Sequence, residues 1–386
     1  MAYYISQGKI PHKRHTIFKN ENGDFIYEQL FGNEGFSGKS SLLYHLHRPT
    51  QINSIGESLD LRPKAAVNFN ILPRKLEGFL IPQKDDFIDS KTCLFFNNSV
   101  EIGMAFPKKS TTAYFLKNAD ADELLFIHKG KGHLSTLFGE INFEYGDYLV
   151  IPKGVIYQIF FETEDNKILF VESKDEIKFP SRYINEYGQL LEHSPFCERD
   201  LKTPNFIEPK NEKGNFLIKI KKQGILHEVN YATHPFDVVG WDGCLYPYGL
   251  SIHDFEPITG RVHQPPPVHQ TFGTKSFVIC SFVPRLFDYH PEAIPAPYNH
   301  SNIESEELLY YVDGDFMSRN NIRPGQFTLH PGGIPHGPAP GSMERSIGQK
   351  ETNELAVMID TFKPLQLTAT ALGIEDINYA YSWIQQ

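Results

Sequence analysis

Short apolar runs separated by turn residues extend along almost the whole chain and limit what it can fold into. Examples are ELLFIHKG, GDYLVIP, KILFVES, SFVICSFVP, ELLYYVDG and LAVMIDTF. Runs of this length and composition are typical of strands. Helix signals are few, and PLQLTATALGIED near the C-terminus is the best candidate for a short helix. The pattern therefore predicts an all-β fold, either a sandwich or a barrel.

A weak internal repeat indicates that the fold is duplicated. DELLFIHKG from Asp122 resembles EELLYYVDG from Glu306, and GDYLVIPKGVIY from Gly146 resembles GQFTLHPGGIPH from Gly325. The order of the segments is the same in both copies. A unit repeated in this way predicts a chain of two barrels. Chance similarity between β-hairpins is the alternative.

The two copies differ in the residues that could bind a metal. At four matching positions the second copy has His300, Glu306, His330 and His336, where the first has Leu116, Asp122, Ile151 and Tyr157. The first copy has thus lost the histidines and kept the strand pattern. We expect only the second barrel to carry a metal site.

A bend is needed before the second copy's polar residues can meet. His300 and Glu306 would lie roughly 20 Å apart on a straight strand. Bend-forming serine and asparagine residues stand between them. The segment HPGGIPHG then places a tight turn between His330 and His336. We therefore expect these four side chains to converge.

Two histidines and one carboxylate on one side of a metal are typical of non-haem Fe(II) oxygenases. Mn(II), Ni(II) and Zn(II) accept the same ligands, so ligand type alone leaves the metal open. Glu304 and Glu307 compete with Glu306 for the carboxylate role. Glu304 lies in the bend, and strand alternation places Glu307 on the face opposite Glu306. The sequence therefore predicts Glu306 as the ligand.

The other histidines and the cysteines are assigned no ligand role. His45 and His47 form an H-x-H pair that we interpret as structural, and His128 and His133 are expected to face solvent in the first copy. The four cysteines are far apart and form no C-x-x-C pair. Neither disulfides nor a zinc site are therefore expected.

Composition excludes several classes of partner. The 386 residues suit two domains or one duplicated domain. The net charge of −10 argues against a nucleic-acid partner. No apolar run is long enough to cross a membrane, and the N-terminus lacks the apolar core of a signal peptide. We therefore expect a cytoplasmic protein with no nucleic-acid and no membrane partner.

Through nearly its whole length the chain resembles the homogentisate 1,2-dioxygenase family. The motifs concerned are KIPHKRHTIF, GFSGKSSLLYHLHRPT, GWDGCLYPYGLSIHDFEPITGRVH, RVHQPPPVHQTF, PYNHSNIESEELLYY and GQFTLHPGGIPHGP. The resemblance implies a mainly β, two-cupin (bicupin) fold of jelly-roll barrels. Residues 1–250 would form an N-terminal domain whose barrel lacks the metal ligands, and residues 251–386 a C-terminal barrel that carries the metal site.

The resemblance also implies an activity and an assembly. Enzymes of this family use Fe(II) and O₂ to open the ring of homogentisate, giving maleylacetoacetate in tyrosine and phenylalanine catabolism. The expected partners are therefore a small aromatic substrate, O₂ and further copies of the chain, in a homo-oligomer that is a trimer or a hexamer.

The resemblance assigns roles to six residues. His300, Glu306 and His336 match the iron ligands, His263 matches a catalytic base or proton donor, and Tyr298, His330 and His336 lie on the substrate side. His269 is our second candidate for the base.

One departure from the family leaves the substrate open. Asp315 stands nine residues after Glu306, where the family often has a tyrosine. Two alternatives therefore remain. One is an Fe(II) ring-cleaving dioxygenase for a related hydroxylated aromatic acid. The other is a metal-binding bicupin without catalysis.

Overall fold

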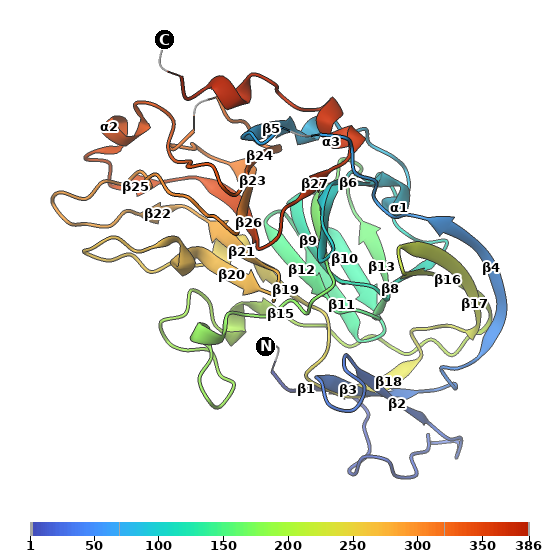
Figure 1. Cartoon of the computed structure of the whole chain (residues 1–386). Coiled ribbons are helices and arrows are strands. Elements are labelled where there is room, and N and C mark those ends of the chain that lie inside the picture. The colour runs from blue at the N-terminus through green and yellow to red at the C-terminus, as the bar shows by residue number, and fades with distance from the viewer. Residues whose placement is uncertain (1–2, 69, 320, 385–386) are drawn as a thin grey trace.

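Strands dominate the computed structural model, which describes residues 3–68, 70–319 and 321–384. The first barrel contains an eight-stranded sheet and a seven-stranded sheet (Figure 1). The order in the first is β15 (Leu201–Lys202), β19 (Tyr248–Ser251), β12 (Asp147–Ile151), β9 (Asp122–Lys129), β14 (Lys167–Ser173), β7 (Val100–Ala105), β6 (Lys91–Phe96), β27 (Gln366–Leu367). The order in the second is β11 (Gly139–Phe143), β10 (Gly132–Thr136), β13 (Ile156–Phe161), β8 (Phe115–Asn118), β16 (Lys213–Lys222), β17 (Ile225–Thr233), β4 (Ile52–Asp60).

The second barrel is built on a six-stranded sheet. Its order is β20 (Gln270–Gly273), β21 (Phe277–Phe282), β26 (Leu355–Thr361), β23 (Glu306–Asp313), β24 (Gln326–His330), β5 (Arg74–Glu77), and a separate pair joins β22 (Arg285–Leu286) to β25 (Glu351–Thr352). A four-stranded sheet near the N-terminus has the order β1 (Ile5–Gly8), β18 (Val238–Gly243), β3 (Ser40–His45), β2 (Tyr27–Gly32).

Helices are short, as the sequence predicts. They are α1 (Phe87–Ser90), α2 (Ser342–Ser346) and α3 (Ala369–Gly373), with 3₁₀ turns η1 (Gly78–Leu80), η2 (Ser181–Tyr183), η3 (Glu198–Asp200), η4 (Ile252–Asp254), η5 (Pro266–His269) and η6 (Tyr379–Tyr381). The helix α3 lies within the segment predicted to be helical. No helix within the described ranges has the length and apolar character that crossing a bilayer requires.

The same order of neighbouring strands occurs twice. In the first barrel β12, β9, β14, β7 and β6 lie side by side, and in the second barrel β24, β23, β26, β21 and β20 do. The internal repeat in the sequence therefore corresponds to two copies of one barrel sheet. Strands such as β9 and β14 are buried along almost their whole length. This burial explains their continuous apolar sequences.

The two barrels exchange strands. β5 comes from the N-terminal part of the chain and pairs with β24 in the second barrel, whereas β27 comes from the C-terminal part and pairs with β6 in the first. The division after residue 250 falls within β19, one residue before that strand ends, and the chain crosses it in both directions. This division stays a prediction.

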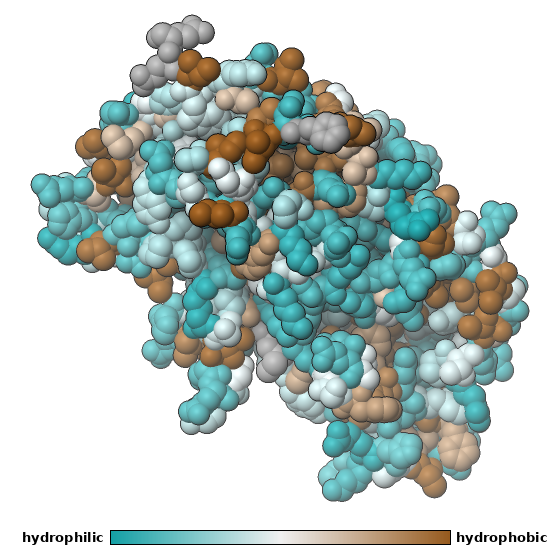
Figure 2. All heavy atoms as spheres, in the orientation of Figure 1, coloured by the Kyte–Doolittle hydropathy of each residue, from teal (hydrophilic) through white to brown (hydrophobic). Residues whose placement is uncertain are grey.

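Polar residues cover much of the molecular face in Figure 2, with apolar residues gathered at the edge where β4 lies. β4 is the outermost strand of its sheet, and its nine residues are all exposed. Among them Ile52, Ile55 and Leu59 are 56%, 78% and 55% exposed. An edge strand of this kind is a potential surface for another chain.

The expectation that His128 faces solvent is wrong. Its Nδ1 lies 2.9 Å from the hydroxyl of Tyr310 in the second barrel, and its ring meets Phe79 edge-on at 4.9 Å. The residue is the last but one of β9 and lies at the contact between the barrels, which the sequence of one strand does not reveal. Burial lowers the pKa of His128 to about 4.

His128 should therefore make the protein sensitive to mild acid. Its pKa in the unfolded chain is about 6.5, so between that pH and about pH 4 the unfolded chain binds the proton and the folded protein does not. The free energy of unfolding should fall by roughly 2–3 kcal/mol across this window as the pH drops. Urea unfolding at several pH values should show a flatter dependence for His128→Gln, and an unchanged slope would contradict the assignment.

Candidate metal centre

A backbone bridge brings His300 and His336 together. The amide of His300 donates to the carbonyl of His336 over 2.8 Å, and the amide of His336 donates back over 2.9 Å. The two rings lie 4.2 Å apart. Gly337 permits this approach, because a Cβ there would lie only 2.0 Å from Oδ1 of Asn299. The bend and the Pro-Gly-Gly turn thus bring the two histidines together, as the sequence predicts.

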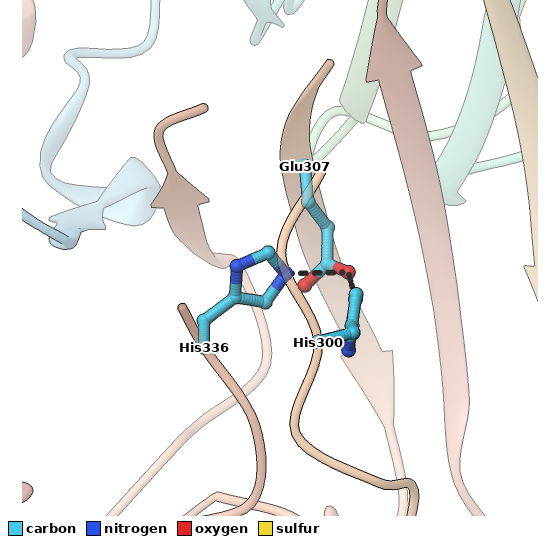
Figure 3. A group of neighbouring side chains, drawn as sticks. All are labelled: His300, Glu307 and His336. Carbon is cyan, nitrogen blue, oxygen red and sulfur yellow. Dashed lines mark ion pairs between the residues drawn. The ribbon is translucent and has the colours of Figure 1, made fainter. Parts of the chain in front are cut away.

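Glu307 supplies the carboxylate between the two imidazoles (Figure 3). Its Oε2 lies 3.5 Å from Nε2 of His300 and 3.4 Å from Nε2 of His336. One ligand atom from each of these three residues falls within 4.8 Å of the others. They form the one group in the described part of the chain that has the spacing of a metal site.

The prediction that Glu306 faces this site is wrong. Its Oε2 accepts a hydrogen bond of 2.6 Å from the amide of Leu365, on the other face of β23. Strand alternation itself holds, but its phase is opposite to the predicted one. The residues that follow are buried on both faces of β23, so the pattern of polar and apolar residues does not reveal which glutamate points inward.

His330 and Arg319 hold Glu307 from behind. Nδ1 of His330 lies 2.9 Å from Oε1 of Glu307, and the hydroxyl of Tyr379 lies 3.2 Å from its Nε2. Nη2 of Arg319 approaches the same Oε1 at 3.7 Å. His330 is 1% exposed and uses both ring nitrogens. Its position is therefore that of a support for Glu307, not the substrate-side position implied by the resemblance.

The charges of this group favour an ionised carboxylate. Burial alone would raise the pKa of Glu307, but the surrounding imidazoles of His300, His330 and His336 hold that pKa well below its usual range. The hydrogen bond to Glu307 raises the pKa of His300. Burial lowers the pKa of His330 to about 4, so its neutral ring can donate through Nδ1 and accept from Tyr379.

A cavity of about 440 Å³ opens beside the cluster. Its inner wall continues along the strands from Glu307 and includes Leu309, Tyr311, Phe282 and Met358. These apolar and aromatic side chains suit a flat apolar ligand.

The predicted residues His263 and Tyr298 lie at the mouth of the cavity. Their rings meet at 5.2 Å, and the ring of Tyr298 is 6.1 Å from that of His300. Nδ1 of His263 lies 3.5 Å from Oδ2 of Asp288, and its side chain is 52% exposed. The structure thus places the predicted base near the cluster, but outside the group of possible ligands.

Comparison with known proteins identifies the family. The model of the homogentisate 1,2-dioxygenase N-terminal region matches residues 74–252. A protein of Saccharolobus solfataricus named "Putative dioxygenase SSO1533" is 42% identical over 385 residues, or 99% of each chain. The chain belongs to the homogentisate 1,2-dioxygenase family. Enzymes named homogentisate 1,2-dioxygenase from Bradyrhizobium diazoefficiens and Mus musculus are 28% and 25% identical over 71% and 74% of this chain, and the matches cover 64% and 67% of those enzymes.

Solved cupin structures resemble the chain only loosely. A cupin 2 conserved barrel domain protein from Leptotrichia buccalis is 12% identical, with a TM-score of 0.31, and the match covers 79% of this chain and 100% of that one. Protein Ylba from E. coli is 9% identical, with a TM-score of 0.37, and the match covers 78% and 94%. The strand pairing within the chain itself shows the two barrel sheets of the bicupin fold.

Asp315, at the position where the family often has a tyrosine, lies outside the lining of the cavity. Asp315 is exposed, and its amide donates to Oδ1 of Asn353 over 3.1 Å. The next residue, Phe316, is the one that lines the cavity wall. In this member of the homogentisate dioxygenase family, an apolar ring therefore takes part in the wall beside the position where a tyrosine is often found.

Sequence reasoning missed Asp360 as a residue of the site. It pairs with Glu307 across β23 and β26 and lines the same cavity. Burial, followed by the charge of Glu307, raises the pKa of Asp360 to about 8. The available signal was a lone acidic residue within the apolar run LAVMIDTF.

Unpaired buried atoms concentrate at this site. Within the ranges that the structure describes, four buried side-chain atoms around the cluster and cavity make no hydrogen bond: His269 Nδ1, Arg319 Nε, His336 Nε2 and Asp360 Oδ1. Buried polar atoms are normally paired in folded proteins. A concentration of this kind is expected of a site that receives a ligand.

In the first barrel, lysine ammonium groups lie beside the carboxylates that match Glu307 and Asp360 of the second barrel. Glu123 and Glu172 pair across β9 and β14 as Glu307 and Asp360 do across β23 and β26. Nζ of Lys91 lies 2.9 Å from Glu123 and also contacts Glu172, which meets Lys221 at 2.6 Å. Tyr157, at the position matching His336, donates to Glu123 over 2.9 Å. The carboxylate pair is therefore neutralised by the protein itself.

Proposed function

We propose that the chain is an Fe(II)-dependent dioxygenase that opens the aromatic ring of homogentisate with O₂ to give maleylacetoacetate. The observation that carries this proposal is the cluster of His300, Glu307 and His336 beside an apolar cavity. Membership of the homogentisate 1,2-dioxygenase family supports the choice of reaction.

The residues present fit an iron ion. Two imidazoles and one carboxylate are a recognised donor set for non-haem Fe(II). Glu307 is ionised at neutral pH because its pKa is held low. Nε2 of His336 is buried and makes no hydrogen bond in the described part of the chain, although it lies 3.4 Å from Glu307. Bound there, Fe(II) would supply acidity to a coordinated phenol and a place for O₂.

The chain's own residues would bind the ring and move its proton. The apolar wall around Leu309 and Phe282 would exclude water from the ring and fix its plane. His263 stands at the cavity mouth with Asp288 3.5 Å from its Nδ1, which leaves Nε2 available to accept the proton of a substrate hydroxyl. Tyr298 packs against that imidazole and limits its movement.

His263→Gln should therefore keep its metal and lose turnover. Removal of a general acid–base group lowers the rate by about 10²–10⁴-fold, so turnover should fall within that range. Metal content and oxygen uptake are to be measured on one sample, with His253→Gln, an exposed histidine in the turn η4, as the matched control. Loss of metal would make His263 a ligand, and unchanged turnover would make it structural.

Oxygen uptake by the iron-loaded protein tests the reaction directly. Rapid uptake with homogentisate, together with maleylacetoacetate as product, would support the proposal. Uptake only with another hydroxylated aromatic acid would support the related ring-cleaving dioxygenase that the Asp315 position leaves open. The absence of uptake with any such acid, at full iron loading, would support a metal-binding bicupin without catalysis.

The same proposal includes a cellular setting and an assembly. The reaction belongs to tyrosine and phenylalanine catabolism in the cytoplasm, and the chain would work as a homo-oligomer, either a trimer or a hexamer. The exposed apolar residues of the edge strand β4 support contact with further copies. Light scattering of the purified protein measures the number of subunits.

A further inference from the structure

Asp360 occupies the position next to Glu307 on the cavity side of the sheet. The two residues are direct partners in the antiparallel pairing of β23 and β26. Side chains of direct partners lie on one face of a sheet, about 5 Å apart at Cβ. Met358 and Ala356, on the same face of β26, also line the cavity. Asp360 thus lies in the cavity wall directly beside Glu307 of the histidine–carboxylate cluster.

The carboxylate of Asp360 has an unused acceptor. Its Oδ1 is buried and has no hydrogen-bond partner among the residues that the structure describes. A buried acceptor left without a donor destabilises the folded protein. The neighbouring carboxylate of Glu307 offers no donor to this acceptor. A hydrogen-bond donor on a ligand in the cavity would satisfy the unpaired Oδ1 of Asp360.

The first barrel indicates what this carboxylate requires. Glu172, at the position matching Asp360, meets Lys91, Lys221 at 2.6 Å and the side-chain amide of Asn118 at 3.0 Å. The same strand position is therefore saturated with donors in one barrel and left with an open acceptor in the other. The open acceptor belongs to the second barrel, which also has the cavity and the histidines.

We propose that Asp360 is a substrate-binding residue whose Oδ1 accepts a hydrogen bond from a ring hydroxyl of the bound aromatic acid. This inference rests on the proposed function and extends it. A hydroxyl that donates to Asp360 satisfies the buried acceptor, whereas an acid without that hydroxyl leaves it unpaired. Asp360 therefore selects hydroxylated rings over otherwise similar apolar ones.

The test compares ligands that differ by one hydroxyl. Wild type, Asp360→Ala and Asp360→Asn are loaded with Fe(II) without oxygen, and calorimetry measures their binding of homogentisate, 2-hydroxyphenylacetate and 3-hydroxyphenylacetate. Asp360→Ala should bind homogentisate and one of the monohydroxy acids about 10- to 100-fold more weakly, because the ring hydroxyl is then left without its buried partner. Binding of the other monohydroxy acid should change little. Asp360→Asn, which keeps a carbonyl acceptor, should recover part of the loss.

Other outcomes would overturn the proposal. Asp313→Asn at the exposed end of β23 is the matched control and should bind all three acids as wild type does. Loss of iron from Asp360→Asn would make Asp360 a metal ligand, and equal weakening of all three acids would make it only structural. If both Asp360 variants bind all three acids as wild type does, the role of Asp360 is refuted but the proposed function is not. If wild type binds none of the acids, the proposed function fails and the role of Asp360 with it.

Discussion

Glu307→Gln should abolish stable metal binding by the protein. The substitution removes the carboxylate that lies between His300 and His336, and it leaves an amide that is a poor ligand for Fe(II). Loss of residues that merely support a ligand lowers metal affinity by about 10–100-fold, so loss of a ligand should exceed about 100-fold. Metal analysis of the protein after anaerobic loading and desalting measures this effect.

The neighbouring glutamate provides the matched control. Glu306→Gln changes the adjacent residue of β23 by the same chemistry, but its side chain bonds the amide of Leu365 on the opposite face. This variant should retain its metal at the wild-type level. Metal loss in Glu306→Gln, with metal retained in Glu307→Gln and both variants folded, would show that β23 has the other phase and that Glu306 is the ligand.

Lys91→Met should destabilise the first barrel by about 3–5 kcal/mol, which is the usual effect of removing one partner from a buried ion pair. The ammonium of Lys91 lies between Glu123 and Glu172, which are 2% and 4% exposed. Without it, two buried carboxylates would face each other with Lys221 as the remaining nearby cation in this network. The urea midpoint of unfolding should fall accordingly.

Two further variants isolate the buried charge. Lys109→Met removes an ion pair with Asp85 in which the two side chains are 71% and 60% exposed, and it should leave the urea midpoint almost unchanged. Combining Lys91→Met with Glu123→Gln should recover part of the lost stability. The second substitution removes the carboxylate charge that the first leaves without its partner. Equal stability of Lys91→Met and Lys109→Met would mean that the buried lysine is not needed to neutralise the pair.

Local signals in the sequence predicted the duplicated β fold and the approach of His300 to His336. Both depend on neighbours along the chain: alternating runs, bends and a Pro-Gly-Gly turn. The choice between Glu306 and Glu307 could not be predicted in this way. It depends on which face of β23 meets the cavity, and both faces of that strand are buried.

Site residues that come from distant strands could not be predicted from patterns among neighbouring residues. Asp360 reaches the site because β26 pairs with β23, and no spacing in the sequence records that pairing. Lys91 and Lys221 enter the first barrel from β6 and β16, outside the repeated segments. The repeat therefore predicted that the first barrel had lost its histidines, but not that ammonium groups lie beside the remaining carboxylates.

Anomalous diffraction from crystals of the iron-loaded protein, recorded at the iron absorption edge, tests the central claim most directly. We expect one strong peak per chain, within bonding distance of His300, Glu307 and His336 in the second barrel, and none between Glu123 and Glu172 in the first. A peak coordinated by Glu306 in place of Glu307, or a peak of equal height in the first barrel, would contradict the account.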